Sequence, residues 1–140
     1  MTLERGFRTT IILSGILMVL VVLIVVFEIE VGNAEIESIE ENLPKGYIEK
    51  TFGEFAFIIL TSLMILLNIV SLLLLYIFYK FGKLLFVLYV ILVLITIIFD
   101  GPVLATPTIE LLAVIGSMLD GAILVFLFFT PIKERFSAST

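Results

Sequence analysis

Four long apolar runs separated by polar segments dominate the pattern of the chain. The runs cover approximately residues 9–28, 54–79, 83–99 and 107–130, and residues 29–53 form the longest polar segment. An α-helix rises 1.5 Å per residue, so about 20 apolar residues cross the roughly 30 Å of hydrocarbon in a bilayer. The pattern therefore predicts four transmembrane helices in a single transmembrane domain, residues 1–140.

Turn and cap signals indicate where these helices begin and end. Thr51 and Glu54 have the spacing of a capping box at the start of the second run. Residues 79–83 predict a short basic turn, which makes the third run an antiparallel partner of the second. An Asp-Gly-Pro sequence at 100–102 ends the third run, and Pro107 suits the first turn of the fourth. We predict an all-α integral membrane protein built as an antiparallel four-helix transmembrane bundle.

The polar segment after the first run contains apolar residues at helical spacing, namely Ile36, Ile39 and Leu43. They predict a short amphipathic helix in this first outer loop, ended by Pro44 and Gly46. We favour a lid that shields the ends of the spans, because single short amphipathic helices usually pack against their own protein. A docking surface for a partner is the alternative.

A cleaved signal peptide is the alternative interpretation of the first run, with Gly32 and Ala34 as the small residues of a cleavage site. The apolar run is longer than the 7–15 residues usual in signal peptides. Glu28 and Glu30 also separate it from the small residues. We therefore expect an uncleaved anchor.

Basic residues predict the orientation in the membrane, because positively charged flanks resist translocation. Six of the eight lie at the amino end, the middle turn and the tail, and two lie in the first outer loop. We therefore expect both termini in the cytoplasm, in the cell membrane, and an acidic outer side. The six are Arg5, Arg8, Lys80, Lys83, Lys133 and Arg135, and the two are Lys45 and Lys50.

Composition narrows the function. Hydrophobic residues make up 61% of the chain, well above the half that is usual in soluble domains. Cysteine and histidine are absent, which removes disulfides, thiol nucleophiles and the usual ligands of zinc, copper and haem. The outer glutamates match no calcium-loop spacing. We expect no enzyme activity, no cofactor, no metal site and no nucleic-acid partner.

Asp120 is the residue that departs most from the apolar pattern, since it lies near the middle of the fourth run. A carboxylate at the bilayer midplane costs several kcal/mol unless it is paired or hydrated, so it should face the bundle interior. Small residues three or four positions apart accompany it and favour close helix packing. They are Ala113, Gly116, Ser117 and Gly121.

The expected partner of Asp120 is Asn68, which lies at a similar depth in the second run. A protonated carboxyl could donate to the amide oxygen, so we expect Asp120 to be neutral at rest. Ser14, Ser71 and Thr96 are the other polar side chains within the runs.

Two functional interpretations follow from these residues. The favoured one is a small structural or accessory protein that assembles with itself or with a larger membrane complex, with Asp120 joining helices. The alternative is an oligomeric channel or an ion- or proton-coupled transporter that uses Asp120. A basic residue supplied to Asp120 by a partner protein is a third interpretation.

Overall fold

The computed structural model describes residues 2–31, 50–51, 53–99 and 107–136. Its elements, in chain order, are α1 (Leu3–Val31), α4 (Glu54–Tyr76), α5 (Lys80–Phe99), α6 (Pro107–Phe129) and the 3-10 helix η1 (Pro131–Glu134). All four α-helices are long and apolar enough to cross a membrane. The predicted all-helical chain with four apolar helices is confirmed, and the amphipathic helix predicted near residues 36–43 lies outside the described residues.

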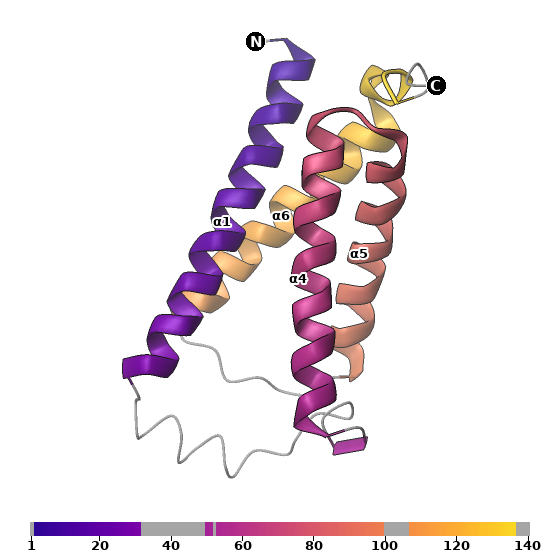
Figure 1. Cartoon of the computed structure of the whole chain (residues 1–140). Coiled ribbons are helices and arrows are strands. Elements are labelled where there is room, and N and C mark those ends of the chain that lie inside the picture. The colour runs from indigo at the N-terminus through magenta and orange to yellow at the C-terminus, as the bar shows by residue number, and fades with distance from the viewer. Residues whose placement is uncertain (1, 32–49, 52, 100–106, 137–140) are drawn as a thin grey trace.

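The helices associate in two pairs. Helix α4 packs chiefly along α5, and α1 packs chiefly along α6. Both termini and the α4–α5 turn lie at the same end of the helices in Figure 1. We call this the packed end, because the buried side chains that join the two pairs gather toward it.

Four phenylalanine rings from different elements meet at the packed end. Phe7 of α1 is fully buried, with its ring centroid 5.7 Å from that of Phe78 and 5.6 Å from that of Phe126. Phe136, after η1, lies 6.2 Å from Phe7 and 5.5 Å from Phe78. Several of these pairs are edge-to-face, the arrangement that the ring quadrupole favours. The cluster therefore ties α1, α6, the tail and the α4–α5 turn together.

The half of each helix farther from this cluster is packed less. Phe27 of α1, Phe55 of α4, Ile98 of α5 and Leu111 of α6 are all more than half exposed. Large contiguous apolar surface is unfavourable in water, and lipid chains cover it at no cost. The exposure of these side chains is what a membrane environment requires.

The turn between α4 and α5 begins earlier in the chain than residues 79–83, where the sequence predicted it. Helix α4 ends at Tyr76, and α5 already begins at Lys80, so only Ile77, Phe78 and Tyr79 connect them. The Tyr79 N–H donates to the carbonyl of Leu74 at 2.8 Å, and Phe78 has a φ of 57°. This is a Schellman helix end, whose left-handed position usually holds glycine. The ring cluster that Phe78 joins offsets the strain.

Gly82, predicted as part of this turn, lies inside α5 instead. A Cβ at this position would lie 2.8 Å from the Leu74 carbonyl carbon and from the Leu75 nitrogen. Glycine is therefore required for the close approach of the α4 and α5 backbones, rather than for the reversal of the chain.

The start of α4 also differs from the prediction. The helix begins at Glu54 with Gly53 at the N-cap position, and no side chain caps it by a hydrogen bond. Gly53 has a φ of 86°, a conformation that side chains disfavour. The predicted capping box with Thr51 as the N-cap is wrong, because the chain bends at Gly53 before the helix starts.

Candidate functional site

Four polar side chains, one from each long helix, lie near the middle of the spans. They are Ser14 of α1, Asn68 of α4, Tyr89 of α5 and Asp120 of α6. Ser14 and Asn68 are buried, while Asp120 and Tyr89 are half-buried. We call this set the midplane polar cluster.

Asp120 is held by α1. The Ser14 hydroxyl donates to Asp120 Oδ1 at 3.2 Å. Helix α6 packs chiefly on α1, which explains why the hydroxyl that donates to Asp120 comes from the first span. The predicted bond from an Asp120 carboxyl proton to Asn68 is wrong, because the Asn68 Oδ1 has no hydrogen-bond partner among the described residues.

Asn68 is linked to the cluster through Tyr89. Tyr89 of α5 lies close enough to Asn68 and to Asp120 to interact electrostatically with both side chains. Tyr89 therefore interacts with one polar group of the α4–α5 pair and one of the α1–α6 pair.

The unpartnered oxygen of Asn68 is the unusual feature of the cluster. Asn68 is only 4% exposed, so lipid and bulk solvent do not reach most of its surface. A buried polar atom without a hydrogen bond costs about 1–3 kcal/mol. Natural proteins rarely leave such an atom, so this oxygen calls for a water or an ion.

The other polar side chains of the spans bond to their own helices. The Ser71 hydroxyl donates to the Asn68 carbonyl at 2.8 Å, and the Thr96 hydroxyl donates to the Leu92 carbonyl at 2.6 Å. Thr96 also lies 3.7 Å from the sulfur of Met64 on α4. Neither residue contributes to the midplane polar cluster, although Ser71 lies one turn from Asn68.

The small residues of α6 divide between two faces, whereas the sequence predicted a single inward stripe. Gly116 is half-buried, and a Cβ there would lie 3.5 Å from a methyl group of Leu17 on α1. The other three are exposed, and a Cβ at Gly121 would have no neighbour within 4 Å. We call these three residues, Ala113, Ser117 and Gly121, the exposed stripe.

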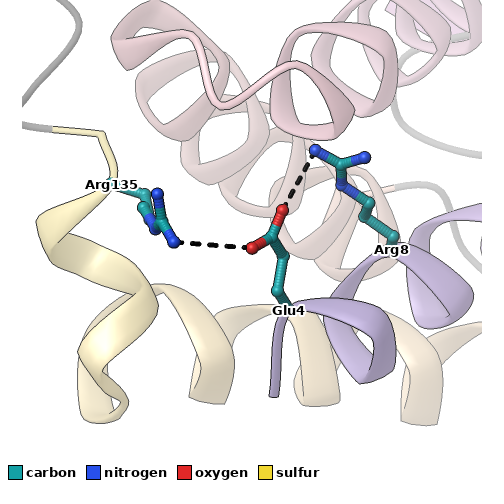
Figure 2. A network of polar contacts seen from close by, with 3 residues as sticks. All are labelled: Glu4, Arg8 and Arg135. Carbon is teal, nitrogen blue, oxygen red and sulfur yellow. Dashed lines mark ion pairs between the residues drawn. The ribbon is translucent and has the colours of Figure 1, made fainter. Parts of the chain in front are cut away.

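Charged residues at the packed end form a separate network. The Glu4 carboxylate of α1 forms ion pairs with the guanidinium groups of Arg8 at 3.2 Å and of Arg135 at 3.7 Å. Figure 2 shows the Glu4 carboxylate between the two guanidinium groups, one from its own helix and one from the residue after η1. The network attaches the tail to the beginning of α1.

Arg8 also stacks on the end of α4. Its guanidinium carbon lies 5.1 Å from the Tyr76 ring centroid and 5.2 Å from that of Phe78. Lys83 of α5 lies 4.1 Å from the Phe128 ring of α6. Such cation–π contacts contribute about 0.5–2 kcal/mol each, so they support the ring cluster at this end.

The sequence favoured Asn68 over Ser14, another polar candidate, as the partner of Asp120, and it did not identify Tyr89. Tyr89 lies about halfway along α5 (Lys80–Phe99). Its depth in the third run could have identified it. No protein-family model matches the chain, and neither the curated proteins nor the solved structures contain a significant match to it.

Proposed function

We propose that the chain is a small structural or accessory membrane protein that assembles through α6 with itself or with a larger membrane complex. The observation that carries this proposal is the exposed stripe. Small residues at spacings of four let another helix approach closely, and within the described residues this face of α6 is left uncovered.

The proposed arrangement is an antiparallel four-span bundle with both termini in the cytoplasm of the cell membrane. All six basic residues of the described ends and turn belong to the packed end, where both termini lie in Figure 1. Positively charged segments are retained on the cytoplasmic side. Four crossings then return the tail to the side on which the chain began.

Substitution of the exposed stripe tests this proposal. Gly121→Leu adds a side chain where the chain itself has open space, so the fold of one copy should be unaffected. Association in proteoliposomes, measured by energy transfer between donor- and acceptor-labelled copies, should weaken at least tenfold. Co-purification of a larger complex from native membranes should be lost in the same variant.

Met118→Phe is the matched control. It enlarges a residue that is 70% exposed on the same helix, roughly 100° around the axis from Ser117. It should leave association intact. If Gly121→Leu associates and co-purifies as the unmodified chain does, the exposed stripe is not an interface and the proposal fails.

A second candidate function, an ion- or proton-coupled channel or transporter, is supported by the midplane polar cluster. One polar side chain from each of the four spans lies at the depth where transporters bind their substrates and coupling ions, and Ser14 and Asp120 are hydrogen-bonded there. Asp120→Asn keeps hydrogen bonding and abolishes the charge. Ion or proton flux into proteoliposomes should disappear in this variant, and flux that persists would exclude Asp120 from the path.

A further inference from the structure

The two lysines at the start of α5 form a charged patch at the packed end. Lys80 is exposed and Lys83 is half-buried, and they lie three positions apart in the first turn of the helix. The ion pairs among the described residues of this end join Glu4 to Arg8 and Arg135, and they do not include either lysine. Like charges at this spacing repel each other, and the positive end of the α5 dipole adds to the cost. An anion beside the two lysines would offset both effects.

Aromatic rings accompany this patch. The Lys83 ammonium lies 4.1 Å from the centroid of the Phe128 ring, so it is held against α6. Tyr79 and Phe81 are exposed, and their ring centroids lie 5.7 Å apart. Exposed aromatic rings beside long basic side chains are typical of the headgroup region of a membrane, where each side chain keeps its apolar part in the lipid. The patch therefore suits the depth of the lipid phosphates.

An exposed apolar face continues from the patch along α5. Leu84 lies one helical turn after Lys80, and Leu88 and Ile91 follow at spacings of four and three. All three are exposed, and residues at these spacings share one face of a helix. We call them the α5 apolar face. It begins beside the lysines and leads toward the centre of the span, which is the course that an acyl chain takes below its headgroup.

From this arrangement we infer that Lys80 and Lys83 bind the phosphate of an anionic lipid whose acyl chain lies along the α5 apolar face. Clusters of basic residues at the end of a transmembrane helix attract anionic lipids. The apolar face favours a lipid over a free phosphate, which would gain nothing from it. The two positive charges favour an anionic lipid over a zwitterionic one, because a zwitterionic headgroup brings its own cation.

The inference goes beyond the assembly role and does not depend on it. The lipid is bound by α5, whereas the proposed interface between chains is the exposed stripe of α6. Each proposal can therefore fail without the other.

Binding of a single lipid to the full-length chain tests the inference. Native mass spectrometry of the chain in a non-ionic detergent separates the free protein from the protein with one bound lipid, and so gives the Kd. We expect phosphatidylglycerol to bind about tenfold more tightly than phosphatidylcholine with the same acyl chains. Millimolar inorganic phosphate should not compete, because it has no acyl chain.

Substitutions then assign the headgroup ligands. Each basic residue near an anionic lipid surface contributes about fivefold in affinity, so Lys80→Gln and Lys83→Gln should each weaken phosphatidylglycerol binding by about that factor. The double substitution should remove the preference over phosphatidylcholine. Lys83→Arg keeps the charge and should restore binding that Lys83→Gln loses.

Arg5→Gln is the matched control. Arg5 is also an exposed basic residue of the packed end, but it belongs to α1, which lies outside the proposed site. Its replacement removes the same charge as Lys80→Gln does, and it should change the Kd by less than about twofold. Gly121→Leu, the variant of the exposed stripe, should bind phosphatidylglycerol as the unmodified chain does.

Three results would overturn the inference. The first is an equal Kd for phosphatidylglycerol and phosphatidylcholine, which would mean that the headgroup charge is not recognised. The second is displacement of the lipid by inorganic phosphate, which would indicate a site for free anions. The third is an equal loss of affinity in Arg5→Gln and Lys80→Gln, which would mean that the packed end attracts lipids only through its total charge.

Discussion

Replacing Gly82 by alanine should separate the α4 and α5 helices at the packed end. The new Cβ would lie 2.8 Å from backbone atoms of Leu74 and Leu75, about 0.6 Å short of the 3.4 Å at which ordinary contact begins. Backbone atoms inside a helix cannot rotate away as the end of a side chain can. The two helices must therefore shift apart, and the contacts beside Gly82 loosen.

The expected magnitude follows from two opposing effects. Overpacking a well-packed site costs about 1–3 kcal/mol. Alanine recovers about 0.5–1 kcal/mol through the restricted freedom of the unfolded chain and its better helix propensity. Gly82→Ala should therefore lose about 1–2 kcal/mol of the free energy of unfolding.

Gly15→Ala and Gly121→Ala are matched controls. Both lie inside spanning helices, and a Cβ at either position meets no atom within 4 Å. They gain the helix propensity without the clash, so they should be neutral or stabilising. The free energy of unfolding is measured by SDS titration in mixed micelles, followed by circular dichroism. If Gly82→Ala is as stable as Gly121→Ala, the close approach of α4 and α5 is refuted.

Three further changes test other parts of the structure by the same titration. Phe7→Ala removes a fully buried ring from the aromatic cluster and should lower the free energy of unfolding by about 3–5 kcal/mol. A loss below about 1 kcal/mol would mean that the cluster does not join the helices. Ser14→Ala removes the donor to Asp120 and should cost about 0.5–1 kcal/mol, whereas a gain in stability would contradict that bond. Glu4→Gln should change stability by less than about 1 kcal/mol because its side chain is 41% exposed, and a larger, salt-insensitive loss would contradict a surface network.

The four helices could be predicted from the sequence because lipid offers backbone groups no hydrogen bonds. Every spanning segment must satisfy its own N–H and C=O groups, so a long apolar run can only be a helix. The ends of the helices were less predictable. Glycine and lysine at 82 and 83 suggested a turn, yet Phe78 takes the left-handed position because its ring joins Phe7 and Phe136.

The midplane site was predictable in depth but not in its contacts. Asp120 and Asn68 stand out as polar residues within apolar runs, whatever the packing. Their partners depend on which helices are neighbours, and hydropathy does not contain that information. The pairing of α6 with α1 brings Ser14 to the carboxylate and turns Ala113, Ser117 and Gly121 to the surface.

Labelling of single cysteines from one side of the membrane tests the proposed topology most directly. The chain contains no cysteine, so each introduced thiol is unique. The positions chosen are Thr2, Lys80 and Lys133 at the packed end and Thr51 before α4, and Lys80, Lys133 and Thr51 are exposed side chains. In intact cells, a membrane-impermeant maleimide should label Thr51→Cys, and label the other three only after permeabilisation. Labelling of Lys80→Cys or Lys133→Cys in intact cells, or protection of Thr51→Cys, would contradict four crossings with cytoplasmic termini.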